Sequence, residues 1–185
     1  MIGLTILGVI VVLLAIFLIS AYNSLVQLRQ RVQNAWAQVD VQLKRRYDLI
    51  PNLVGAVKGY AQHEKSTLES VTQARNMAMN ARNIQEQMQA ENMLSSALRS
   101  LFAVAEAYPD LKANTNFMQL QAELTDTESK IAFARQFYND TVQKFNTKIE
   151  LFPTNLVAGM LGFAMVDYFN LQGEPNARQA VKVEF

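Results

Sequence analysis

The N-terminal end of the chain is an uninterrupted apolar segment. Every residue from 2 to 19 is apolar except Thr5, and the first charged side chain is Arg29. At about 1.5 Å per residue, a helix from Ile2 to Tyr22 extends roughly 30 Å, the thickness of the hydrocarbon core of a bilayer. A cleaved signal peptide is the alternative, but nothing basic precedes Ile2 and the run is not followed by a clear small-x-small cleavage site. The segment therefore predicts a retained transmembrane anchor, whose apolar side chains are Ile2, Leu4, Ile6, Leu7, Val9, Ile10, Leu13, Leu14, Ile16, Phe17, Leu18 and Ile19.

The distribution of basic residues on the two sides of this anchor predicts its orientation. Nothing but the terminal amine precedes it, whereas Arg29, Arg31 and then residues 44–46 follow it, against a single acid, Asp40. Basic residues near a membrane span favour the cytoplasmic side. We therefore expect a bacterial inner-membrane protein with a single span, its N-terminus outside and its C-terminal body in the cytoplasm.

The apolar pattern continues at helical spacing beyond the anchor. No proline occurs between Tyr22 and Ile50, and the apolar positions include Val32, Trp36, Val39 and Leu43. The anchor helix is therefore expected to continue straight out of the membrane, with Trp36 in the core. Asp48 and Pro51 then predict a corner that starts a second helix, because Pro51 cannot donate a backbone hydrogen bond to the preceding turn. A kinked but continuous helix through Pro51 is the alternative.

Three further helices are expected after this corner. The second extends to about Arg82, the third from about Ile84 to Ala107, where Tyr108-Pro109-Asp110 ends it, and the fourth from about Asn114 to Leu151. Short connections favour antiparallel neighbours. The predicted fold is all-α: an N-terminal transmembrane helix followed by an up-and-down four-helix bundle with long helices.

The last long helix carries a seven-residue apolar repeat. Such a repeat favours near-parallel packing of helices with a slight supercoil. Together with Trp36, its members are interpreted as a helix seam or self-association surface and not as a cofactor site. The repeating positions are Phe117, Leu124, Ile131, Tyr138, Phe145 and Phe152.

A short apolar segment follows Pro153. Residues 156–166 carry no charge, but eleven residues are too few to span a bilayer. An even number of antiparallel helices returns the segment to the membrane end, where it lies in the interface or packs on another subunit. The candidate contacts are Leu156, Val157, Met160, Leu161 and Phe163. The chain thus divides into an anchor (1–21), a helical bundle (22–152), an apolar C-terminal segment (153–170) and a flexible tail (171–185).

The composition and the absence of complete motifs argue against several kinds of binding or catalytic site. The net charge of +1 does not indicate nucleic-acid binding, and the absence of cysteine, with a single histidine, argues against a structural zinc site. His63-Glu64 begins like a zinc-protease motif, but Thr67 stands where the second histidine is needed. Residues 44–46 are interpreted as a solvated basic patch or a protein contact. We expect no catalytic, cofactor-binding or metal-binding residue.

Several strings resemble the LemA family. They include residues 40–54, with Asp48-Leu-Ile-Pro51 at their end, and residues 106–114, with Tyr108-Pro109-Asp110 at their centre; Tyr138-Asn139 and Phe152-Pro153 also match. The resemblance covers almost the whole chain and implies a bacterial plasma-membrane protein with a four-helix bundle and no settled biochemical activity. It also implies an association with a membrane metalloprotease of the HtpX type, and one relative serves magnetosome membranes. No residue is carried over as catalytic.

Two functions follow as hypotheses. The first is a non-enzymatic membrane-anchored scaffold, whose partners are the lipid bilayer and further copies of itself, and which organises or remodels the bacterial membrane. The alternative is an adaptor or partner of the membrane metalloprotease in quality control of membrane proteins.

Overall fold

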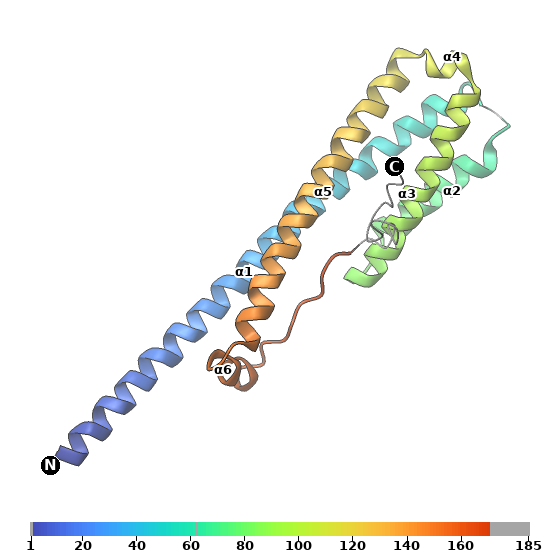
Figure 1. Ribbon diagram of the computed structural model, residues 1–185. Helices are drawn as coiled ribbons and strands as arrows, with labels where there is room; N and C mark the ends of the chain where they lie inside the picture. The colour runs from blue at the N-terminus through green and yellow to red at the C-terminus, as the bar shows by residue number, and fades with distance from the viewer. Residues whose placement is uncertain (1, 62, 171–185) are drawn as a thin grey trace, which may run out of the picture. The chain divides into compact units, whose positions relative to one another are not determined.

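The computed structural model describes residues 2–61 and 63–170, and all regular structure among them is helical (Figure 1). The predicted all-α class is therefore confirmed, whereas the predicted flexible tail, residues 171–185, lies outside the described residues. The helices are α1 (Ile2–Lys58), α2 (Lys65–Met79), α3 (Ile84–Ala107), α4 (Pro109–Lys112), α5 (Thr115–Glu150) and α6 (Thr154–Met160).

The chain forms two compact units. Among the described residues, the first contains 2–40 and 133–168, and the second contains 41–61, 63–132 and 169–170. The first unit thus holds the anchor end of α1, the second half of α5, and α6. The second holds the remainder of α1, α2, α3, α4 and the first half of α5.

Helix α1 passes through Pro51 without a break and ends at Lys58. The predicted corner at Asp48–Pro51 is therefore wrong, and the turn into α2 lies at residues 59–64. Proline removes a helical hydrogen bond, here the one to the carbonyl oxygen of Tyr47. In the structure Arg75 of α2 replaces that donor, because its Nε donates to the Tyr47 oxygen at 2.7 Å. With this carbonyl satisfied and Ile50 buried, the helix continues.

Asparagine side chains start two of the later helices. Asn83 Oδ1 accepts a hydrogen bond from the Glu86 backbone N–H at 2.8 Å. In turn, the Glu86 carboxylate accepts one from the backbone N–H of Arg82 at 2.9 Å. Asn114 Oδ1 accepts from the Phe117 backbone at 3.0 Å. These bonds satisfy donors that have no partner within the first helical turn. They explain why α3 begins at the predicted residue and α5 within one residue of it.

The seven-residue stripe of α5 lies inward over most of its length. Its members from Phe117 to Phe145 are buried, but Phe152 is 78% exposed. The reason is local, since α5 ends at Glu150 and Phe152 no longer follows its helical phase. Trp36 is half-buried, with its ring edge-on to the Tyr138 ring at 5.3 Å between centroids.

Candidate functional site

A buried ion pair lies at the centre of the second unit. Arg46 of α1 is 1% exposed and its Nη1 is 2.9 Å from Oε2 of the fully buried Glu91 of α3. The Arg46 Nη2 donates to Ser95 Oγ at 2.9 Å, and its Nε is 2.9 Å from Oε1 of Glu128 on α5. One guanidinium group therefore connects α1 to α3 through hydrogen bonds, one of them to a charged carboxylate, and to α5 through an ion pair.

Two further side chains complete this cluster. The hydroxyl of Tyr47 donates to Glu91 Oε1, and Gln87 Nε2 donates to the same oxygen at 2.9 Å and to the Tyr47 hydroxyl at 2.7 Å. Burial raises the pKa of the Glu91 carboxyl, while the charge of Arg46 opposes this shift. Burial and the nearby Glu91 carboxylate raise the pKa of Tyr47, so that Tyr47 stays a neutral donor.

The cluster is suited to fixing helix positions. Arg46, Tyr47 and Glu91 are closed to solvent, and removing one partner of such a buried charge pair leaves the other charge uncompensated, which strongly disfavours helix positions that separate the two. The expectation that Arg46 belongs to a solvated patch is wrong, whereas its neighbours Lys44 and Arg45 are exposed. A signal was present in the sequence, because Arg46 falls on the same helical stripe as Leu43 and Ile50.

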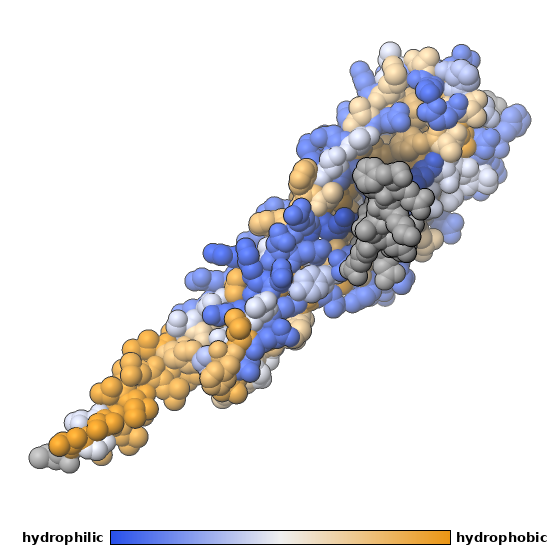
Figure 2. Space-filling model, in the orientation of Figure 1, coloured by the Kyte–Doolittle hydropathy of each residue, from blue (hydrophilic) through white to orange (hydrophobic). Residues whose placement is uncertain are grey.

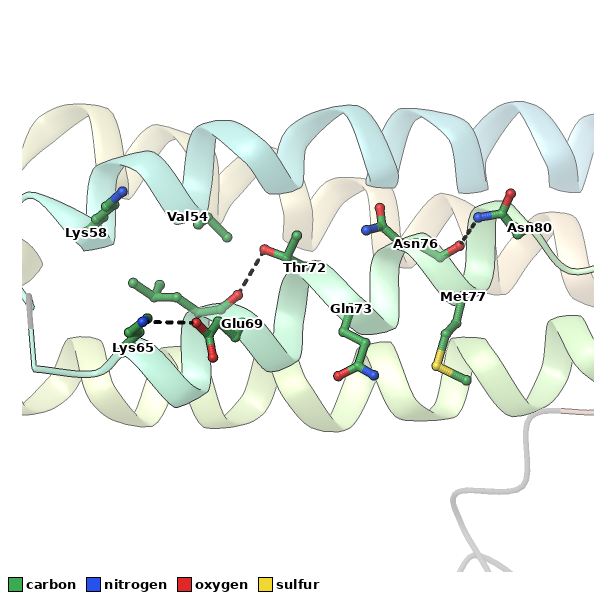
Figure 3. Close-up of a pocket in the computed structure, with 10 residues that line it drawn as sticks. Val54, Lys58, Lys65, Glu69, Thr72, Gln73, Asn76, Met77 and Asn80 are labelled. Atoms are coloured by element: carbon green, nitrogen blue, oxygen red, sulfur yellow. Dashed lines mark hydrogen bonds and ion pairs between the residues drawn. The ribbon is translucent and has the colours of Figure 1, made fainter.

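A groove between α1 and α2 lies in the second unit and has a volume of about 970 Å³ (Figure 3). Apolar Leu68 and Met77 lie along it, interrupted by the amides of Gln73 and Asn76. At one end Lys65 faces Glu69, with 3.7 Å between Nζ and Oε1. The groove offers apolar contact with scattered hydrogen-bonding groups, which is the composition of a surface that receives a peptide segment.

The first unit brings the C-terminal apolar segment back to the end of the anchor. The ring of Phe163 lies edge-on to Tyr22 at 6.2 Å and to Phe145 at 6.4 Å, and the Arg29 guanidinium is 5.3 Å from its centroid. Phe163 of this segment therefore lies beside Tyr22, at the end of the anchor. Contact of the segment with lipid or with another subunit stays a prediction.

Hydrogen bonds attach this segment to α5. The side-chain amide of Asn146 donates to the Val166 carbonyl at 2.9 Å and accepts from the Val166 N–H at 2.9 Å. The Tyr138 hydroxyl donates to the Asp167 carbonyl at 3.0 Å. An asparagine side chain that hydrogen-bonds to both the N–H and the carbonyl of one residue fixes the position of the chain, as the backbone of a neighbouring strand does.

The candidate contact residues of this segment divide between two faces. Val157 is buried and Phe163 is half-buried, so both face inward. Leu156, Met160 and Leu161 are exposed, Met160 to 84%. Together with Phe152 they form the surface that we call the α6 face: Phe152, Leu156, Met160 and Leu161.

The N-terminal part of α1 is the one helix among the described residues that is long and apolar enough to cross a membrane. Most of its surface is hydrophobic in Figure 2. Every anchor side chain named from the sequence is exposed except Phe17, which is half-exposed. This supports a single-pass membrane anchor.

The sequence pattern of the LemA family matches residues 35–185. This chain belongs to the LemA family. The match begins after the anchor and includes both polar clusters described above. The family assignment agrees with the resemblance found in the proline-containing strings of the sequence.

Relatives extend the comparison. The chain is 30% identical to "Protein LemA" of Metamycoplasma hominis over 148 residues, which cover 80% of this chain and 68% of that protein. It is 24% identical over 178 residues to "Magnetosome protein MamQ 2" of Paramagnetospirillum magneticum, covering 82% and 65% of the two chains. It is also 24% identical to "Magnetosome protein MamQ" of Magnetospirillum gryphiswaldense, covering 83% and 66%. The chain thus spans about two thirds of these relatives, and none of their names describes a reaction.

Proposed function

We propose that this protein is a non-enzymatic scaffold, anchored by one span in the bacterial inner membrane, which self-associates and thereby organises or remodels that membrane. The observation that carries the proposal is an exposed aromatic pair on α5: Phe133 is 72% and Phe137 is 51% exposed. The two residues lie one helical turn apart and therefore share a face of the helix. Relatives named as magnetosome proteins support a role at membranes.

The membrane favours association through such a small surface. Copies anchored in one bilayer move in two dimensions and meet at a high effective concentration. An aromatic pair that is too small to hold a stable dimer in solution then suffices for assembly, because the anchor has already reduced the entropy lost on association. The buried Arg46–Glu91 pair contributes by keeping the helices in one register.

We infer that the extramembrane part of α1, with α2, α3 and α5, forms the up-and-down four-helix bundle. The contacts of Arg46 with Glu91 and Glu128 support this arrangement, since they join α1 to α3 and α5. The bond from Arg75 to Tyr47 supports the pairing of α1 with α2. Antiparallel order follows from the short connections at residues 59–64 and 80–83.

The mass of the full chain in native membrane nanodiscs tests the scaffold. We expect a uniform particle of several copies, which Phe133→Glu together with Phe137→Glu converts largely to monomers. Met118→Glu is the matched control, because Met118 is an exposed apolar residue of the same helix. A monomer for the unaltered chain, or equal dissociation by the control, contradicts the proposal.

The second candidate is an adaptor of a membrane metalloprotease. The α1–α2 groove favours it, because its alternating apolar and amide lining suits an extended or helical segment of a partner. Stoichiometric co-elution of a protease in mild detergent, lost on Met77→Glu but not on Phe133→Glu, supports the adaptor. Retention of a homogeneous particle without any partner supports the scaffold.

A further inference from the structure

We propose that α6 lies in the headgroup region of the leaflet from which α1 emerges, with the α6 face in contact with lipid. The occupant of this face is thus the bilayer that holds the anchor. The inference rests on the membrane anchor and not on self-association.

The depth of α6 follows from its contact with Tyr22. Measured along α1 from Ile2, Tyr22 lies at about 30 Å, where the hydrocarbon core ends. Phe163, three residues after α6, packs on the Tyr22 ring at 6.2 Å. The guanidinium of Arg29 reaches back to Phe163 at 5.3 Å, which places a cation at the level of lipid phosphates. Tyrosine rings and arginine side chains are enriched at this level of membrane proteins.

The composition of the segment suits an interface. No charged side chain occurs between Glu150 and Asp167, which flank it. Within α6 the inward face is formed by Thr154, Val157 and Ala158, which are buried. The outward face therefore carries large apolar side chains with no charge among them, and it is too short to span the bilayer.

The position of this face is fixed by the rest of the unit. Asn146 holds both backbone groups of Val166, and Tyr138 holds the carbonyl of Asp167. These bonds attach the end of the segment to α5, and the buried Thr154, Val157 and Ala158 leave the opposite face of α6 pointing away from its own unit. A surface that is held apolar-side-out beside a membrane anchor is preorganised to contact that membrane.

Spin labels test the contact in the whole 185-residue chain, which has no cysteine to interfere. Met160→Cys and, as the matched control, Phe137→Cys are labelled and reconstituted at one copy per nanodisc. Phe137 is exposed in the same unit but lies well before the end of α5. We expect the ratio of collisions with oxygen to collisions with an aqueous nickel reagent to be several-fold higher at Met160→Cys.

Equal ratios at the two positions overturn the inference. A label at Met160→Cys that is shielded from both reagents only when several copies share a disc assigns the face to a second copy, and this also overturns it. Quenching by lipids brominated on their acyl chains gives an independent readout, with Met160→Trp expected to be quenched more strongly than Phe137→Trp in a Trp36→Phe background. Because the labelled protein is a single copy, failure of self-association leaves this test readable.

Discussion

At the residue scale, the carbonyl of Tyr47 explains how a proline is accommodated within α1. Pro51 lacks the N–H that this carbonyl requires, and Arg75 supplies a donor from another helix. The residue that keeps α1 continuous is therefore outside α1. A polar group of the backbone that is deprived of its partner inside a protein destabilises the fold unless a substitute is found.

We predict that Arg75→Met lowers the free energy of unfolding by about 1–3 kcal/mol, because the Tyr47 carbonyl then has no donor. The same substitution should cost much less in a Pro51→Ala background, where residue 51 regains an N–H. Denaturant titration in detergent, followed by helical circular dichroism, measures both costs. Arg82→Met, at an exposed arginine, is the control. If Arg75→Met lowers the free energy of unfolding equally in the two backgrounds, Arg75 does not replace the N–H donor that Pro51 lacks.

The buried ion pair gives a second prediction at this scale. Glu91→Gln should destabilise the fold by about 3–5 kcal/mol, since Arg46 loses its buried counterion. Replacing both partners, as Arg46→Met with Glu91→Leu, should recover much of that loss. The exposed Glu123→Gln is the control. A double variant that is less stable than Glu91→Gln would show that the pair itself stabilises the fold.

Tyr138 provides a prediction for alkaline pH. Burial, with a smaller contribution from Asp167, raises its pKa from 10.0 to about 12. Between these values the unfolded chain releases the tyrosine proton and the folded chain keeps it, so stability falls as pH rises through this window. The difference in tyrosinate absorbance between the unaltered chain and Tyr138→Phe should therefore titrate near 12. A difference that titrates near 10 contradicts the buried position.

At the element scale, a segment without regular structure is attached to α5 by side-chain hydrogen bonds. Phe163 still donates its backbone N–H to the Ala158 carbonyl of α6 at 3.0 Å. Beyond it, side chains of α5 hydrogen-bond to the backbone of Val166 and Asp167. The position of residues 166–167 therefore depends on side chains of α5.

We predict that Asn146→Leu releases this segment. Two hydrogen bonds of about 1 kcal/mol each are lost, so amide exchange at Val166 should become faster by about tenfold or more. Hydrogen exchange measured on peptides that cover residues 163–168 gives the result. Gln143→Leu, at an exposed position of α5, should leave the rate unchanged. Unaltered exchange in Asn146→Leu would mean that Phe163 and Tyr138 hold the segment without Asn146.

At the scale of the whole molecule, the anchor decides which compartment contains the extramembrane helices. Arg29 and Arg31 follow the apolar segment closely, and their positive charge favours the cytoplasmic side. The orientation determines which partners are accessible, because a cytoplasmic body meets cytoplasmic proteins and the inner leaflet.

Labelling at Ser66→Cys tests this orientation, because Ser66 is exposed at the start of α2. An impermeant maleimide should leave intact cells unlabelled at this position and should label it after permeabilisation. Permeabilised cells thus provide the control for reactivity of the thiol. Efficient labelling of intact cells would reverse the orientation.

The sequence by itself determined the features that depend on neighbours along the chain. The anchor, the all-α class, the start of α3 and the buried stripe of α5 all follow from apolar residues repeating at helical or seven-residue spacing. Each of these signals extends over a few turns of one helix and needs no knowledge of what the helix packs against.

Tertiary structure decided the features whose partners are distant in sequence. Arg75 reaches Tyr47 across 28 residues, and Glu91 meets Arg46 across 45. Pro51, which the sequence pattern predicts to form a corner, is thereby kept inside a helix. Arg46, which the pattern predicts to be solvated, is buried. Local pattern cannot predict either outcome, because the desolvation of a charge or a carbonyl is tolerated only when a specific partner from another helix compensates it.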